Sequence, residues 1–172
     1  MPDDSYKKGL TDKQLDAHFP RDRPDPTDGV FEFGLVLGGT VSAGAYTAGV
    51  LDFLIQALDD WAAAKAAGKP DIPKHDVNLS VITGTSGGAV NGAMLLRLLG
   101  RTDPRGADPN NPFYTTWTQG LGFAELLSVD GDSSPPLSLL NANALKAKAD
   151  AIVNLPGGTA PETRRTYLSD PL

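Results

Sequence analysis

The strongest constraint on the fold is a local pattern that occurs twice in the chain. Each copy is an apolar, β-branched stretch that runs into a glycine-rich turn and then into a segment with helical periodicity. The first strand is expected at residues 31–37 and the second at residues 77–83, with a helix after each turn. Repetition of strand, turn and helix predicts a mainly parallel sheet with covering helices. The expected fold class is α/β, with three layers and helices on both faces of the sheet.

The helices are predicted from spacing and from their end signals. The first begins after the 38–44 loop, and Gly68 and Pro70 are expected to end it. The second is expected from about Ala89 to Leu99, and Asn141 is expected to cap a later one. One or two short helices are expected within residues 112–128. Apolar residues at spacings of three and four give the expected core face of the first helix: Val50, Leu51, Leu54, Ile55, Leu58 and Trp61.

The two ends of the sequence differ from this middle part. Residues 1–29 are polar and rich in proline and charge, and we expect them to form a flexible arm with one short helix near Thr11, whose spacing to Gln14 fits a capping box. Only two buried strands are recognisable, and two strands do not complete an α/β sheet. Residues 30–172 are therefore expected to be the N-terminal part of a larger domain whose sheet is incomplete at the C-terminus, unless the remaining strands are ones that the sequence does not reveal.

Composition excludes several classes of function. The 172 residues include no Cys and two His, which excludes disulfide scaffolds, Cys nucleophiles and thiolate zinc sites. Fifteen Lys and Arg stand against 21 Asp and Glu, and the net charge of −6 disfavours nucleic acid as a partner. No signal peptide or transmembrane helix is recognisable, so a cytoplasmic or peripheral membrane location is expected.

The second glycine-rich turn carries the candidate nucleophile, Ser86. Gly84-Thr85-Ser86-Gly87-Gly88 matches the pattern G-x-S-x-G. Small residues two positions before and after the serine permit a tight, strained turn that presents the hydroxyl at a helix N-terminus. Gly84, Thr85, Gly87 and Gly88 would form this nucleophile elbow. The alternative is a glycine-rich turn whose serine only caps a helix.

The first glycine-rich loop, residues 38–44, is the candidate oxyanion hole. Its backbone N–H groups can point at an anion. A phosphate-binding P-loop would need Lys and Ser or Thr where Ala45 and Tyr46 stand, and the dinucleotide fingerprint is not matched. An oxyanion hole needs only close backbone donors, so Gly38, Gly39 and Thr40 are expected to supply it.

No histidine in the sequence fits the role of the base. None follows Ser86, while His18 lies in the arm and His75 lies before the serine's own strand. Both are interpreted as solvated side chains. Ser86 therefore uses a carboxylate base, or its partner lies outside this chain, or Ser86 is not a nucleophile.

The two glycine motifs, in this order, resemble the patatin-like phospholipase family. The matching segments are GLVLGGTVSAGAYTAGVLDFL and VITGTSGGAVNGAML, within residues 31–100. The resemblance implies a Ser–Asp dyad without histidine, a phospholipid or other lipid ester as substrate, and no metal or organic cofactor. The glycine loop departs from the family pattern, because Thr40 and Val41 replace glycines and Ala43 replaces a basic residue.

The resemblance also places the dyad aspartate in a D-G-[AG] motif far after the serine. Asp28 lies in the arm, and Asp130 follows Ser86 by only 44 residues in a turn-rich segment. The catalytic aspartate is therefore expected beyond Leu172, with Asp130 as the less favoured alternative, and this chain alone is expected to be inactive.

These features together predict a lipid acyl hydrolase of phospholipase A or esterase type that contacts membranes peripherally. Two other functions stay open. One is a non-catalytic lipid- or protein-binding module that retains the fold, and the other is an acyltransferase that passes the acyl group to an acceptor other than water.

Overall fold

The structure is a computed structural model that describes residues 11–18, 28–40, 43–128, 141–155 and 165–168. The chain divides into two units, Met1–Val30 and Phe31–Leu172. In the first unit, helix α1 spans Asp12–His18. Its first turn is the predicted capping box, since Thr11 N donates to Gln14 Oε1 at 2.9 Å and Gln14 N donates to Thr11 Oγ1 at 3.4 Å.

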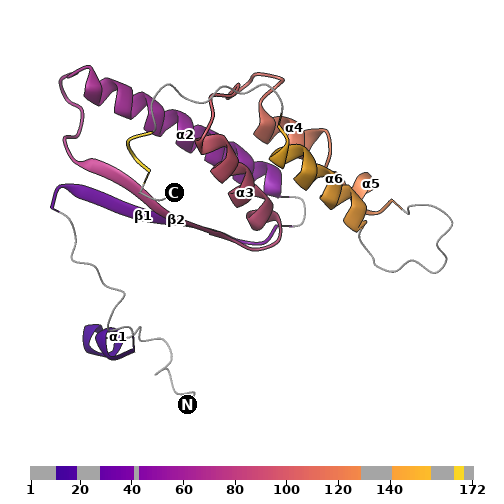
Figure 1. Ribbon diagram of the computed structural model, residues 1–172, viewed down its shortest axis with the longest axis horizontal. Helices are drawn as coiled ribbons and strands as arrows, with labels where there is room; N and C mark the ends of the chain where they lie inside the picture. Colours follow the sequence, from indigo (N-terminus) through magenta and orange to yellow (C-terminus); the bar gives the residue numbers. More distant parts are fainter. Residues whose placement is uncertain (1–10, 19–27, 41–42, 129–140, 156–164, 169–172) are drawn as a thin grey trace, which may run out of the picture. The chain divides into compact units, whose positions relative to one another are not determined.

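The sheet consists of β1, Val30–Leu37, beside β2, Asp76–Gly84 (Figure 1). Ser80 Oγ donates to Phe33 O and Thr83 Oγ1 donates to Leu35 O, both at 3.4 Å, so the two strands advance in the same direction. The predicted α/β class with a parallel strand pair is confirmed. The three-layer arrangement and the incompleteness at the C-terminus stay predictions.

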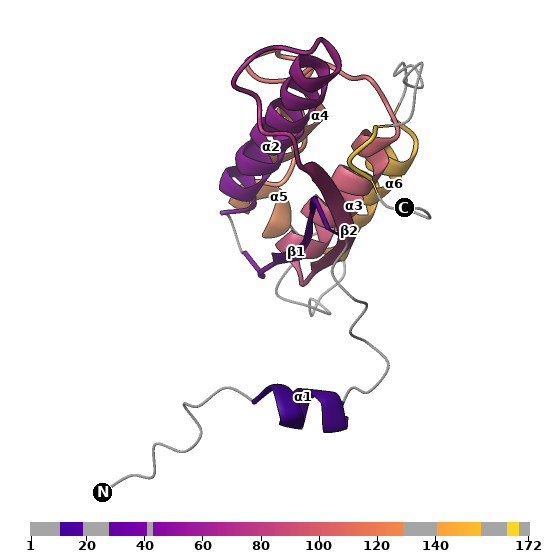
Figure 2. The same cartoon turned by 90° about the vertical axis from the view of Figure 1, so that its left-hand side faces the viewer.

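The described part of the second unit contains five helices besides this strand pair. Figure 1 shows α2 and α3 over the same side of the strands, and Figure 2 shows α4 packed on α2 and α6 beside α3. The predicted helices all form, within one or two residues of the expected bounds. They are α2 (Gly44–Ala66), α3 (Gly87–Leu99), α4 (Pro112–Thr118), α5 (Phe123–Leu126) and α6 (Ala142–Val153). Among the described helices, none is both long enough and apolar enough to cross a bilayer.

The core face of α2 differs from the predicted one at Val50, which is 49% exposed. The buried line of this helix instead includes Asp52, only 5% exposed. The Asp52 carboxylate accepts hydrogen bonds from Gly106 N at 2.8 Å and from Asn111 Nδ2 at 3.0 Å. A buried carboxylate needs such donors, so the loop at 105–111 permits Asp52 to lie on the inward face of α2 beside the buried Leu51 and Ile55.

The segment 165–168 lies along the free edge of β2. Leu168 forms a parallel bridge with Leu79, and Leu79 N donates to Tyr167 O at 2.8 Å. Two side chains of this segment, Arg165 and Tyr167, bind the carboxylate of Asp59 on α2. Tyr167 Oη donates to Asp59 Oδ1 at 2.7 Å, and Arg165 binds both oxygens of Asp59 at 2.9 and 3.0 Å. This cluster fixes the segment to α2.

Alkaline pH is expected to destabilise the fold through Tyr167. Burial, and then the hydrogen bond to Asp59, raise the pKa of the Tyr167 phenol above its ordinary value. The unfolded chain releases this proton near pH 10, whereas the folded chain keeps it. The stability that the buried neutral phenol contributes is therefore present below about pH 10 and is lost as the pH rises further.

Urea unfolding between pH 8 and pH 11 should show this loss of stability, and Tyr167→Phe should reduce the loss. The half-exposed Tyr114 provides the control, and a loss in Tyr167→Phe equal to that in Tyr114→Phe would contradict this expectation.

Candidate active site

Ser86 lies in a strained turn between β2 and α3. Its φ is 53° and its ψ is −124°, and it is the N-cap residue of α3. A residue with a Cβ avoids positive φ, and holding one there costs about 1–3 kcal/mol. Ser86 is exposed, so its side chain is open to an incoming ligand. The predicted strained turn at a helix start is confirmed, while the role of Ser86 as a nucleophile stays a prediction.

The glycines around Ser86 are required by close backbone approach. A Cβ at Gly84 would lie 2.5 Å from Gly88 O, and one at Gly87 would lie 2.7 Å from Thr40 O. A Cβ at Gly88 would collide with Leu37 O and lie 2.5 Å from Gly38 O. Real Cβ atoms do not tolerate such distances, so larger residues would force the serine turn away from the end of β1.

The glycine loop after β1 lies directly against the serine turn. A Cβ on Gly39 would be 3.6 Å from Ser86 Cβ, and Thr85 N donates to Leu37 O at 3.1 Å. The predicted proximity of residues 38–40 to Ser86 is confirmed, because β1 and β2 are neighbours whose carboxyl ends meet at one edge. Among the residues that the structure describes, the buried Thr40 hydroxyl has no hydrogen-bond partner. The oxyanion role of Gly38, Gly39 and Thr40 stays a prediction.

A buried amide that the sequence analysis missed anchors the end of this loop. Asn91, on the first turns of α3, is fully buried. Its Nδ2 donates to Gly44 O at 3.0 Å, and its Oδ1 accepts from Trp117 Nε1 at 2.8 Å. Gly44, the last glycine of the loop, packs so closely on the Trp117 ring that a Cβ there would overlap it. The available signal was an amide between the apolar residues Val90 and Met94 in the first half of the helix.

Replacing Asn91 with Ala is expected to cost about 2–4 kcal/mol of the free energy of unfolding. The change leaves Gly44 O and Trp117 Nε1 buried without partners, and each unsatisfied group costs about 1–3 kcal/mol. Urea unfolding followed by Trp117 emission in a Trp61→Phe background measures the loss. Asn110→Ala, at an exposed turn, is the matched control. A loss no larger than that of the control would refute the anchoring role.

The base is not identified within the part of the chain that the structure describes. There, the Ser86 side chain makes no capping hydrogen bond to α3, and no His, Cys, Asp or Glu cluster suits a metal ion. His75 is exposed beside Trp61 and precedes β2, whereas Ser86 follows it, and nine strand residues span about 26 Å. His75 therefore lies too far away to act as the base. Asp130 lies outside the described residues.

Comparison with known proteins decides the family. The sequence pattern of the family described as Patatin-like phospholipase matches residues 35–122, which is just over half of the chain. The match includes the glycine loop and the serine turn. The chain belongs to the patatin-like phospholipase family.

One similar protein is the uncharacterized protein y4iI of Sinorhizobium fredii. The two are 37% identical over 169 residues, which cover 85% of this patatin-like chain and 24% of that protein. The chain thus spans about a quarter of the relative's length. No solved structure matches the chain significantly.

Proposed function

We propose that this patatin-like protein is a serine acyl hydrolase that cleaves lipid esters, with Ser86 as its nucleophile. The observation that carries the proposal is the strained, exposed Ser86 at the start of α3, in contact with the glycine loop at Gly39. Residues 30–172 would form the N-terminal part of the catalytic domain, with residues 1–29 as an arm. Peripheral contact with a membrane belongs to the same proposal.

In the proposed reaction, Ser86 Oγ attacks the ester carbonyl carbon and gives its proton to the base. The ester C–O bond then breaks, and the leaving alcohol takes that proton. Water, which gives a proton to the base, then attacks the carbonyl carbon of the acyl-enzyme. The bond from that carbon to Ser86 Oγ breaks, Oγ takes the proton from the base, and the fatty acid leaves and ionises to a carboxylate. Backbone N–H groups of Gly38, Gly39 and Thr40 would hold the oxyanion, where one well-placed donor is worth about 3 kcal/mol. The N-terminus of α3 favours the same negative charge.

The base is proposed to be an aspartate. We prefer one beyond Leu172, because Asp130 stands only 44 residues after Ser86. Under this proposal, residues 1–172 alone hydrolyse esters poorly. Appreciable activity of this chain, lost on Asp130→Asn, would identify Asp130 as the base instead.

A non-catalytic lipid-binding module is the second candidate. Thr40 and Ala43 favour it, because both depart from the glycine-loop pattern that the family resemblance implies. An acyltransferase would share the serine turn, and product analysis with an added alcohol acceptor would reveal it.

A fluorophosphonate probe tests the proposal on the full-length protein. Such probes react covalently with activated serines, so mass spectrometry should find the adduct on Ser86. Ser80→Ala, which removes an exposed hydroxyl from β2, should leave labelling unchanged. Folded protein that is not labelled would contradict the hydrolase and favour the non-catalytic module.

A further inference from the structure

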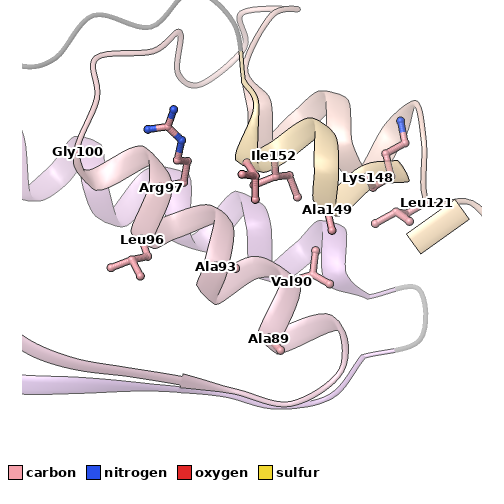
Figure 3. Close-up of a pocket in the computed structure, with 11 residues that line it drawn as sticks. Ala89, Val90, Ala93, Leu96, Arg97, Gly100, Leu121, Lys148, Ala149 and Ile152 are labelled. Carbon is pink, nitrogen blue, oxygen red and sulfur yellow. The ribbon is translucent and has the colours of Figure 1, made fainter. Parts of the chain in front are cut away.

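An apolar groove runs between α3 and α6, beginning at Ala89, three residues after Ser86 (Figure 3). Its cavity volume is about 660 Å³, within the usual range for small-molecule sites. Figure 3 shows α3 and α6 forming its two walls. From Ala89 to Gly100 the α3 wall is about 16 Å long. Its apolar lining includes Ala89, Val90, Ala93, Leu96, Leu121 and Ile152.

Two cationic side chains, Arg97 and Lys148, border this groove. The helix itself explains the position of Arg97. Arg97 is exposed and lies in the last turn of α3, where a positive charge stabilises the helix dipole. Lys148 lies within α6 and is partly buried, with its Cε and Nζ against Gly120. Asp150, the acidic residue nearest in sequence, pairs with Lys146 at 2.7 Å.

Lys148 therefore places a positive charge beside apolar surface without an anion among the described residues. Partial burial weakens the screening of that charge by water and salt. An exposed cation such as Arg97 attracts an anion less strongly, because solvent screens it. Figure 3 shows Lys148 near Leu121 at one end of the groove and Arg97 near the other.

We propose that this groove binds a free medium-chain fatty acid, with its alkyl chain between α3 and α6 and its carboxylate paired with Lys148. The lining of the groove is mostly apolar, as an alkyl chain requires, and each buried methylene adds to binding. A neutral ester offers no charge to Lys148, so the charge favours the free acid over the ester. Arg97 would lie near the methyl end of the bound alkyl chain.

The proposed site stands apart from the chemistry at Ser86 but bears on it. Hydrolysis of a lipid ester would release a fatty acid, and the groove begins one helical turn after Ser86. Retention of that product would slow the next turnover. The inference itself rests on the groove and on Lys148, so binding can be tested without any hydrolysis.

The experiment titrates decanoate and methyl decanoate into full-length protein carrying Ser86→Ala, which prevents ester hydrolysis, and follows binding by calorimetry. Decanoate is expected to bind once per chain and at least tenfold more tightly than the ester. Lys148→Gln should weaken decanoate binding about tenfold and leave ester binding unchanged. Arg97→Gln, the matched control with the same change of charge on the same groove, should change decanoate binding less than twofold.

A second variant tests the groove itself. Ala93→Trp fills it from the exposed side of α3 and should remove decanoate binding, while Ala57→Trp on the exposed side of α2 should not. Circular dichroism checks that each variant is folded, and if Ala93→Trp is not, the comparison of Lys148→Gln with Arg97→Gln decides. Equal affinity for acid and ester, equal effects of the two charge variants, or no decanoate binding would each overturn the proposal. Loss of esterase activity alone would count only against the proposed hydrolase.

Discussion

Replacing Ser86 with Ala is expected to lower kcat for ester hydrolysis by the full-length protein at least about 10³-fold. Removal of a catalytic serine costs up to about 10⁶-fold in well-studied hydrolases, because no other group forms the acyl-enzyme. Hydrolysis of p-nitrophenyl butyrate measures the effect. Ser80→Ala, which removes a hydroxyl that donates to Phe33 O on the same strand pair, is the matched control and should retain activity within twofold. Retained activity in Ser86→Ala would exclude Ser86 as the nucleophile.

Ser86→Gly separates the strain of the turn from its chemistry. Glycine adopts a φ of 53° freely, so this variant should be equally inactive yet about 1 kcal/mol more stable than Ser86→Ala. Urea unfolding of the two variants gives the difference. Equal stability would show that the turn stores little strain.

The parts of the fold that rest on local signals were predictable from sequence. β-branched runs, close-packed glycines and caps such as Thr11 and Asn141 act over a few residues, and the strands and helices form where these signals place them. The contact between the glycine loop and Ser86 followed as well, because parallel neighbours bring their carboxyl ends together.

The remaining features depend on polar groups that meet across long sequence separations. Periodicity treats Asp52 and Asn91 as surface residues, yet both are buried. Gly106 N and Asn111 Nδ2 donate to Asp52 Oδ2, while Asn91 donates to Gly44 O and accepts from Trp117 Nε1. Val50 is the converse case, since periodicity predicts it in the core while the structure leaves it 49% exposed. Spacing within one helix contains no information about those partners.

The segment at 165–168 was unpredictable for another reason. Its pairing with β2 is one bridge at Leu168, too short to give an alternating apolar pattern. Its position depends on Asp59, a residue of α2 whose carboxylate binds Arg165 and Tyr167. The groove between α3 and α6 likewise exists only once α6 is placed against α3.

Gly88→Ala is expected to cost at least about 3 kcal/mol of the free energy of unfolding and to remove activity. The new Cβ would collide with Leu37 O and lie 2.5 Å from Gly38 O. Both are backbone atoms at the end of β1, so no side chain can rotate away, and β1 must separate from the serine turn. Overpacking of this kind costs about 1–3 kcal/mol even where side chains can adjust. That loss is a large part of the stability of an ordinary domain.

The same substitution elsewhere in the chain provides the control for this effect. Gly49 lies on the exposed side of α2, and a Cβ there would meet nothing within 4 Å. Gly49→Ala should therefore stabilise the protein by about 0.5–1 kcal/mol, since Ala restricts the unfolded chain and favours helix. Urea unfolding of both variants, with hydrolysis of p-nitrophenyl butyrate, gives the comparison. If Gly88→Ala were as stable and active as Gly49→Ala, the end of β1 would not lie against the serine turn, and the oxyanion assignment to Gly38, Gly39 and Thr40 would fail with it.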